Sequence, residues 1–200
     1  QKTFGAAITA DYPGTITKTS DGGFMIAGST YSFGSSSESH GWLIKIDSTG
    51  NEVWNKTHSQ EKHHISSLVE TPDGGFVGTG YSWNRDISMN GTMWMFKTDA
   101  TGDFVWSNYY YDGAFGNSVV VDSKGDFLFT GFTTLNDNTD LIIMKKNQSG
   151  VEVWNFTKGG EQNDYPVDII EVCDSTFSLV GVTSSFGTEV SSPWFLKLRV

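Results

Sequence analysis

A sequence period of about 50 residues constrains this chain more than any other feature. Four phenylalanines, each preceded by a short polar segment, recur at steps of 52, 51 and 50 residues, and each has a glycine four positions later. The pairs are Phe24 with Gly28, Phe76 with Gly80, Phe127 with Gly131, and Phe177 with Gly181. A period of this length indicates a protein built from packed copies of one supersecondary unit.

Two further marks repeat in the same register. One is a lysine that ends an apolar triplet, at Lys45, Lys97, Lys145 and Lys197. The other is a glycine followed at a fixed offset by tryptophan, at Gly50 and Trp54, Gly102 and Trp106, and Gly150 and Trp154. A fourth tryptophan of this series would fall one place before Gln1.

Each period divides into four short segments that are rich in β-branched and aromatic residues. In the second period these segments are His64–Thr71, Phe76–Trp83, Thr92–Thr98 and Asp103–Tyr110. They lack the 3,4 spacing of apolar residues that is typical of helices, and glycine-containing turns of the kind that tight hairpins need separate them. One period therefore predicts a four-stranded antiparallel sheet.

Such a sheet cannot bury both of its faces alone, so the copies must pack face to face. Radial packing predicts a single all-β domain over residues 1–200, a four-bladed β-propeller with four-stranded antiparallel blades. We expect the blades at about 11–58, 63–110, 114–158 and 164–200. Residues 1–5 align with the segment that follows Trp54, so we expect them to form the outer strand of the last blade, beside Trp194–Leu198, and to close the ring.

The repeat resembles a family of extracellular propeller repeats found in surface and secreted proteins of archaea, bacteria and some protists. Three segments match in register: Trp54-Asn-Lys-Thr57, Asp73-Gly-Gly-Phe76 and Trp42-Leu-Ile-Lys45. The third period departs from the pattern, with Lys124-Gly-Asp in place of Asp-Gly-Gly and Ile142 in place of the strand tryptophan. The resemblance implies the propeller fold and a location outside the cell, and it implies no particular activity.

The composition argues against nucleic acid binding and membrane insertion. The formal net charge is −10, with 13 Lys+Arg against 23 Asp+Glu, which disfavours nucleic acid as a partner. No apolar run approaches the length of roughly 18 residues that a membrane helix needs, so we expect no membrane insertion. Cys173 is the only cysteine, and its place in an apolar run predicts a buried side chain.

Several motifs have a simpler explanation than a metal site or a catalytic site. The segments that start at Asp47, Asp73 and Asp99 share features with calcium loops, but Asp-x-x-Gly and Asp-Gly-Gly are also what hairpin turns need, so we predict turns, no metal and no cofactor. His63 and His64 are adjacent on a strand and must point to opposite faces, which prevents them from sharing one ion. No nucleophile motif is present.

One carboxylate and one set of rings align with the inner ends of the blades. Asp168 occupies the position of Thr15, Ser67 and Ser118, and a lone acid among hydroxyls is not a catalytic pair. The rings are Tyr12, His64, Phe115 and Tyr165, one in each blade. They could stack on a sugar, or they could cap the core at the end of the channel.

Four Asn-x-Ser/Thr sequons stand at Asn55, Asn90, Asn147 and Asn155. Asn55 and Asn155 occupy the same position of the outer strand, and all four asparagines are expected to be exposed. We therefore expect a secreted or cell-surface glycoprotein whose mature chain starts at Gln1. The predicted role is that of a structural or adhesive module that binds other proteins, copies of itself or glycans. A carbohydrate-binding propeller is the first alternative, and an enzyme with a channel site around Asp168 is the second.

Overall fold

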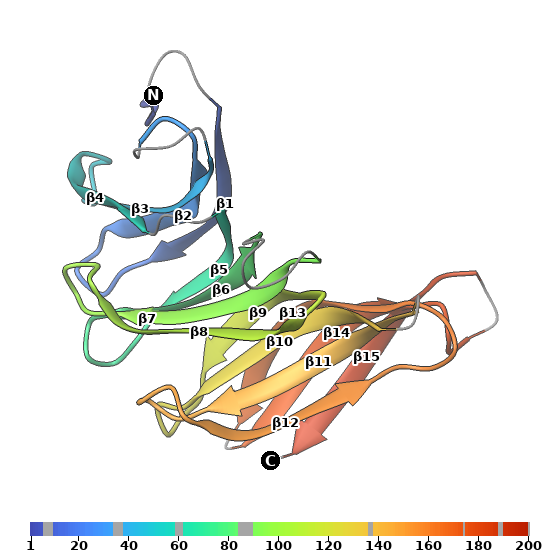
Figure 1. Ribbon diagram of the computed structural model, residues 1–200. Coiled ribbons are helices and arrows are strands. Elements are labelled where there is room, and N and C mark those ends of the chain that lie inside the picture. The colour runs from blue at the N-terminus through green and yellow to red at the C-terminus, as the bar shows by residue number, and fades with distance from the viewer. Residues whose placement is uncertain are drawn as a thin grey trace.

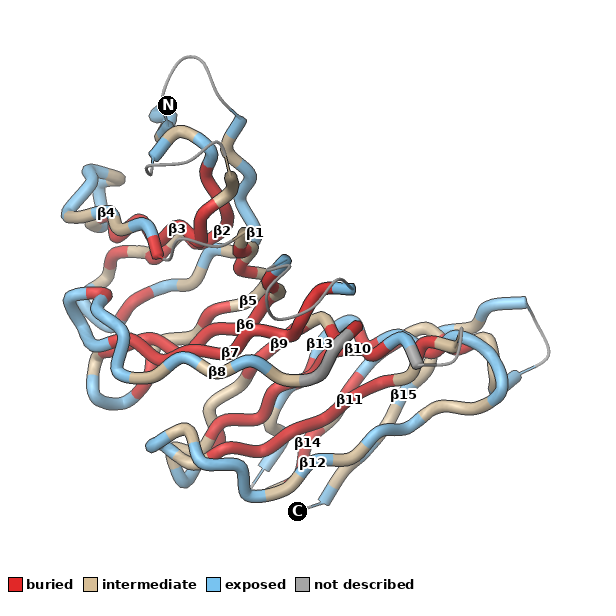
Figure 2. The backbone as a smooth tube through the Cα atoms, viewed as in Figure 1, coloured by how far each residue is buried: buried red, intermediate tan, exposed pale blue. Residues whose placement is uncertain are grey.

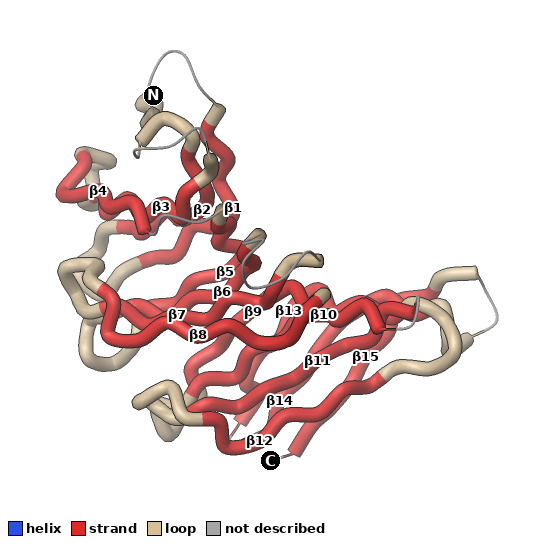
Figure 3. The backbone as a smooth tube through the Cα atoms, viewed as in Figure 1, coloured by secondary structure: helices blue, strands red, loops and turns tan. Residues whose placement is uncertain are grey.

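The computed structural model describes residues 1–5, 10–33, 38–58, 62–83, 90–135, 138–173, 175–187 and 190–199. Within these ranges it contains fifteen antiparallel strands and no helix (Figure 3). The prediction of an all-β fold made of antiparallel sheets is confirmed.

The strands form four sheets, one for each sequence period. The first sheet contains β1 (Asp11–Lys18), β2 (Phe24–Thr30), β3 (His40–Ile46) and β4 (Glu52–His58). The second contains β5 (His63–Glu70), β6 (Phe76–Ser82), β7 (Thr92–Thr98) and β8 (Phe104–Asp112). The third contains β9 (Ala114–Val121), β10 (Phe127–Leu135), β11 (Asn138–Lys146) and β12 (Glu152–Lys158). The fourth has only three strands, β13 (Asp164–Cys173), β14 (Thr176–Thr183) and β15 (Ser192–Arg199).

The four sheets follow one another in a curved row, in chain order (Figure 1). The first strand of each sheet packs against the first strand of the next, so β1, β5, β9 and β13 form a common inner edge. The outer strands β4, β8 and β12 are more exposed (Figure 2). This arrangement resembles that of consecutive blades in a propeller.

The predicted closure of the ring is wrong. Residues 1–5 form no strand, the fourth sheet stays three-stranded, and β15 pairs with β14 alone. The first and fourth sheets lie at opposite ends of the row (Figure 1). Residues 1–5 lie beside the first sheet, where Lys2 contacts Asn51 and Phe4 packs against Trp42, and not beside β15.

Packing between consecutive sheets forms three apolar cores. We call the side of a sheet that is turned toward the next sheet its forward face, and the opposite side its backward face. Met25, Ala27 and Leu43 on the forward face of the first sheet pack against Trp94 and Phe96 on the backward face of the second. Equivalent positions join the second sheet to the third and the third to the fourth. The apolar triplets before Lys97 and Lys145 thus each serve two interfaces, because their side chains alternate between the faces of the sheet.

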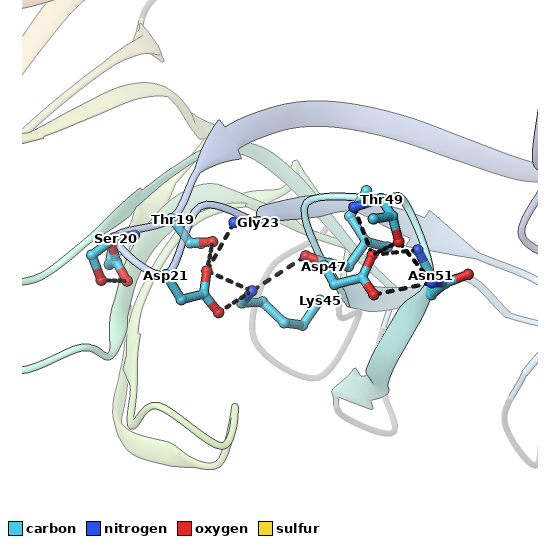
Figure 4. Close-up of polar contacts among 10 residues, drawn as sticks. Thr19, Ser20, Asp21, Gly23, Lys45, Asp47, Thr49 and Asn51 are labelled. Carbon is cyan, nitrogen blue, oxygen red and sulfur yellow. Dashed lines mark hydrogen bonds and ion pairs between the residues drawn. The ribbon is translucent and has the colours of Figure 1, made fainter.

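The repeated lysine and the Asp-Gly-Gly turn hold each other in place. Lys45 Nζ lies 2.8 Å from Asp21 Oδ2, and the same carboxylate accepts hydrogen bonds from Thr19 Oγ1 and Gly23 N (Figure 4). In the second sheet Lys97 Nζ lies 2.6 Å from Asp73 Oδ2. Burial alone would raise the pKa of Asp73, but hydrogen bonds from Lys97 and from its own turn outweigh it and lower the pKa to about 2.

The third sheet keeps this ion pair although Lys124 replaces the turn aspartate. Lys145 Nζ lies 2.8 Å from Asp122 Oδ2 and 3.2 Å from Asp126 Oδ2. These carboxylates stand two positions before and two positions after Lys124. The departure from the repeat therefore moves the partner of the buried lysine and does not remove it.

The repeated tryptophans pack over the glycines of the last turn in the second and third periods. The ring of Trp54 lies over Gly102 of the next sheet, where an added Cβ would come within 2.7 Å of it. Trp106 covers Gly150 in the same way, again at 2.7 Å from an added Cβ. Both glycines also have positive φ, 86° and 78°, so the turn needs glycine for two independent reasons.

Cys173 is exposed, contrary to the prediction. The apolar run that contains it forms β13 of the fourth sheet, and no further sheet covers the forward face of that sheet. An apolar run in the sequence indicates burial only if a neighbouring sheet supplies the cover.

Ser175 gives a direct test of the turn geometry. Its φ is 58°, and it stands where the first three repeats have Gly22, Gly74 and Gly125, all with positive φ. A left-handed conformation costs a residue with a side chain about 1–2 kcal/mol, part of which glycine returns through its greater freedom in the unfolded chain. We therefore expect Ser175→Gly to raise the free energy of unfolding by about 0.5–1 kcal/mol in urea titrations. Ser178→Gly, in the middle of β14, is the control and should lower it; equal effects of the two changes would contradict the assignment.

Candidate functional site

The four ring positions predicted from the repeat lie at equivalent places along the inner edge. Tyr12, His64, Phe115 and Tyr165 each stand near the start of the first strand of a sheet. Opposite them on the second strands are Ser29, Tyr81, Phe132 and Val182. The alignment of the four positions by register is thus correct.

The repeated glycines hold the backbone at these positions. Gly28, Gly80, Gly131 and Gly181 follow the repeated phenylalanines. A Cβ on any of them would lie between 1.8 and 2.3 Å from the carbonyl oxygen of the ring residue in the same sheet. Only glycine allows such an approach, which explains why the Phe-to-Gly spacing is kept in every period.

The rings contact one another from sheet to sheet. Tyr81 stacks on His64 with centroids 5.2 Å apart and meets Phe115 edge-on at 5.5 Å. Phe115 stacks on Phe132 at 5.2 Å, and Phe132 meets Tyr165 at 5.4 Å. These contacts link the second, third and fourth sheets through an unbroken series of aromatic rings.

Three further rings extend this series. Trp83 lies 5.7 Å from Phe115, and Tyr31 lies 6.3 Å from Tyr12. A hydrogen bond of 3.2 Å between Ser29 Oγ and His64 Nδ1 joins the first sheet to the second at this point. We call the whole set the aromatic row; its members are Tyr12, Tyr31, His64, Tyr81, Trp83, Phe115, Phe132 and Tyr165.

The aromatic row is partly open to solvent and uncharged at neutral pH. Tyr12 is 55% exposed, Trp83 44% and Tyr165 37%. Burial lowers the pKa of His64, and burial together with the nearby Tyr31 raises the pKa of Tyr81, so both side chains are neutral. The arrangement combines a core cap with a surface, because the inner rings support the exposed ones.

Sequence reasoning missed four members of the row: Tyr31, Tyr81, Trp83 and Phe132. Tyr81 and Phe132 hold the same register position in two sheets, but Ser29 and Val182 hold it in the others. Tyr31 and Trp83 belong to the connections between the second and third strands, where the repeat is weak. The only available signal was a second aromatic residue close to the repeated glycine in three of the four periods.

The two adjacent histidines point to different neighbours. His63 Nε2 lies 3.0 Å from the hydroxyl of Tyr109, and the ring of His63 packs on Trp94. His64 faces Tyr81 in the aromatic row. Among the described residues, no group of three His, Cys, Asp or Glu side chains is placed to hold a metal ion.

The acidic turns use their carboxylates internally. Asp47 Oδ1 accepts hydrogen bonds from Thr49 N, Thr49 Oγ1 and Asn51 N (Figure 4). Asp99 makes the same contacts within its own turn. These bonds lower the pKa of Asp47 and of Asp99, and the geometry is that of a hairpin turn closed by an aspartate side chain.

Asp168 connects two sheets. Its Oδ1 accepts hydrogen bonds from Ser118 Oγ at 2.8 Å and from Ile169 N at 2.9 Å. Ser67 Oγ accepts a hydrogen bond from Val119 N in the adjacent sheet. The polar groups at this register position thus tie neighbouring inner strands together, as a structural role requires.

Three of the four sequon asparagines are exposed: Asn55, Asn90 and Asn155. Asn55 and Asn155 lie at the same position of β4 and β12, and their side-chain amides bond to Glu52 and Glu152, respectively. Asn147 is half-buried, and its Oδ1 accepts hydrogen bonds from Ser149 N and Val151 N. Its place in a turn is as expected, but its exposure is lower than predicted because the side chain closes that turn.

Comparison with known proteins gives the fold only. The sequence matches no protein-family model and no curated protein. The structure is similar to a protein of unknown function from Dyadobacter fermentans, with a TM-score of 0.64 and 11% identity over 94% of this chain and 53% of that one. The chain therefore spans about half the length of that protein.

Two more distant similarities are to a protein of unknown function from Bacteroides caccae and to a streptogramin B lyase. The first has a TM-score of 0.43 and 9% identity, and it covers 86% of this chain and 72% of that one. The second has a TM-score of 0.29 and 10% identity, and it covers 94% of this chain and 83% of that one. Within the described residues, the structure contains no helix able to cross a membrane.

A buried histidine makes stability depend on pH. His58 packs on Phe104 with centroids 4.2 Å apart, and burial, assisted by the charge of Lys56, lowers its pKa to about 4. The unfolded chain binds the proton below pH 6.5, whereas the fold resists it down to about pH 4. The low pKa of His58 therefore leaves the free energy of unfolding unchanged above pH 6.5. As the pH falls from 6.5 to about 4, the free energy of unfolding decreases by up to about 3 kcal/mol.

We expect His58→Phe to reduce this loss, because phenylalanine cannot bind a proton. Phenylalanine suits the position, since Phe4 is the residue at the same register position of the N-terminal segment. Free energies of unfolding for both proteins, measured in urea between pH 7 and pH 4, provide the test. His64 contributes a smaller slope of the same sign to both proteins, because its pKa is also lowered. Parallel curves for the two proteins would show that His58 is not the group responsible.

Proposed function

We propose that this protein is a non-catalytic binding module of the cell exterior that holds a neutral carbohydrate on the aromatic row. The observation that carries the proposal is the unbroken contact of rings across the second, third and fourth sheets, with Tyr12, Trp83 and Tyr165 partly exposed. Adhesion is the role that such a surface would serve in a secreted or cell-surface protein.

Aromatic rings bind sugars because the C–H face of a pyranose packs on the face of a ring, while its hydroxyls stay in water or reach polar neighbours. Half-exposed rings backed by other rings suit this use, since little side-chain freedom is lost on binding. The row is uncharged and the chain carries a net charge of −10, so a neutral glycan fits better than a sulfated or phosphorylated one.

The resemblance of the repeat to extracellular propeller repeats supports a location outside the cell. The exposed sequons at Asn55 and Asn155 support the same location, because N-glycosylation needs accessible acceptors. An enzyme is the weaker alternative, because Asp168, the acid at the inner edge, is bound to Ser118. A purely structural module remains the other outcome of the test below.

A glycan array with neutral polysaccharides included tests the binding proposal. We expect reproducible binding by the wild type and a loss of about three- to tenfold in affinity for Tyr165→Ala and for Trp83→Ala, as one stacking contact is worth about 0.5–1.5 kcal/mol. Tyr109→Ala is the matched control, because Tyr109 is also 37% exposed but lies on the outer strand β8.

Equal losses for Tyr165→Ala and Tyr109→Ala would move the site away from the aromatic row. If the wild type binds no glycan on the array, carbohydrate binding is overturned and the structural role is left. Melting temperatures of the three variants, measured beside the array, separate a loss of binding from a loss of folding.

Glycosylation of the protein from its native source tests the proposed location. We expect glycopeptide analysis to find Asn55 and Asn155 modified, since both are exposed and each donates a hydrogen bond to a neighbouring exposed glutamate. Asn147 should be modified less, because its side chain closes a turn. If Asn55 and Asn155 are both unmodified, the location outside the cell loses its main structural support.

A further inference from the structure

The forward face of the fourth sheet exposes residues that the other sheets bury. Val180 is 46% exposed and Phe195 is 63% exposed. The residues at these two positions in the first three sheets are all at most 1% exposed: Ala27 and Leu43, Thr79 and Met95, and Thr130 and Ile143. The fourth sheet thus has the residues of an internal interface but no sheet packed against them.

The inner part of the backward face of the first sheet is open in the complementary way, whereas Trp42, Ile44 and Ile46 on the same face are buried. Ile16 is 61% exposed, whereas Leu68, Val119 and Ile169 at the same position are 1–2% exposed. A pocket of about 210 Å³ lies on this face; Phe4, Tyr12, Ile26, Trp42 and Ile44 are among its lining residues. Each end of the row therefore carries one half of an interface that occurs three times within the chain.

Residues 1–5 already lie where the outer strand of a preceding sheet would lie. Lys56 on β4 pairs with Asp103 of the second sheet, at 2.6 Å. Lys2, which aligns with Lys56, donates to Asn51, which aligns with Asp103. The N-terminal segment thus contacts the first sheet as β4 contacts the second.

The contacts of Phe4 also show that the N-terminal segment occupies the place of an outer strand. Phe4 packs against the cluster of Trp42, Ile44 and Ile46 on the backward face of the first sheet. His58, which aligns with Phe4, packs on Phe104 at the backward face of the second. The first sheet therefore has beside it the outer strand of a sheet whose other three strands are not there.

The fourth sheet lacks that same strand. It consists of β13, β14 and β15, and β15 pairs with β14 alone. A groove of about 230 Å³, lined by Trp154, Phe156 and Leu198 among others, runs beside the free edge of β15. The fourth sheet thus has three strands and no outer strand. At the other end of the row, residues 1–5 occupy the place of an outer strand and have no such three strands beside them.

We propose that a second copy of this chain docks head to tail, with its first sheet on the forward face of the fourth sheet. In this arrangement residues 1–5 of the second copy lie along β15, with Lys2 opposite Phe195 as Lys56 is opposite Leu43 in the first sheet. The contact repeats the packing of the three internal interfaces and removes the free edge of β15. The occupant is another copy because the two ends of this chain expose complementary halves of one interface, and these ends lie apart in a single copy (Figure 1).

A glycan at Asn55 is compatible with this docking. Asn55 stands on the outer strand of the first sheet, and Asn155 has the same place in the third sheet. Asn155 stays exposed although an internal interface forms on its side of the sheet. Formation of an interface on this side of a sheet therefore leaves the position in solvent.

Sedimentation equilibrium of the untagged chain, from low to high micromolar concentration, tests the proposal. We expect species of at least twice the chain mass of 22.0 kDa. Phe195→Glu and Ile16→Glu each place a charge in one half of the interface, and each should shift the protein to the monomer. Because both side chains are more than 60% exposed, neither change should alter the melting temperature of the monomer.

Mixing the two variants distinguishes head-to-tail docking from other contacts. Phe195→Glu keeps an intact first sheet and Ile16→Glu keeps an intact fourth sheet, so their mixture should form dimers that neither variant forms alone. Val105→Glu, at a side chain 57% exposed on the outer strand of the second sheet, is the control and should behave as wild type. A wild type that stays monomeric at every concentration overturns the proposal, as does a mixture that stays monomeric or a control that dissociates.

Discussion

Face-to-face packing between consecutive sheets is the interaction on which the rest of this structure depends. A single four-stranded sheet with apolar side chains on both faces is not stable in water, so each sheet packs against its neighbours in the row. The alternation of side chains along a strand makes one residue serve the forward interface and the next serve the backward one. Leu43 and Ile44 show this division on β3: the first packs toward the second sheet, and the second belongs to the cluster at the open end.

The lysines of the first three repeats illustrate how polar groups are accommodated in this packing. Lys45, Lys97 and Lys145 are buried between sheets, where an unpaired ammonium group would be very unfavourable. Each ends at a carboxylate of the first hairpin turn, so the ion pair also fixes the turn. The third sheet shows that the requirement is electrostatic and not tied to one sequence position, since Asp122 and Asp126 together replace the missing turn aspartate.

The aromatic row and the two end faces are both consequences of the same repeat. Repetition of one ring position along an inner edge brings rings from successive sheets into contact, and this produces an extended surface without any specialised loop. Repetition of one interface also leaves an unmatched half at each end of the row. A repeat that builds a surface for a ligand therefore builds at the same time a surface for another copy of itself.

The sequence alone determined the strands, the turns and the register. In the second period, predicted strands such as Phe76–Trp83 and Thr92–Thr98 agree with β6 and β7 to within one residue, because alternation and turn glycines are local signals. The equivalence of Tyr12, His64, Phe115 and Tyr165 followed from register in the same way. Tertiary structure decided whether four sheets close a ring, because the angle between sheets depends on the volumes of all side chains in three interfaces. It also decided that Cys173 and Phe195 face solvent. A residue is buried only if another part of the structure covers it, and an apolar run in the sequence does not indicate whether such a neighbour is present.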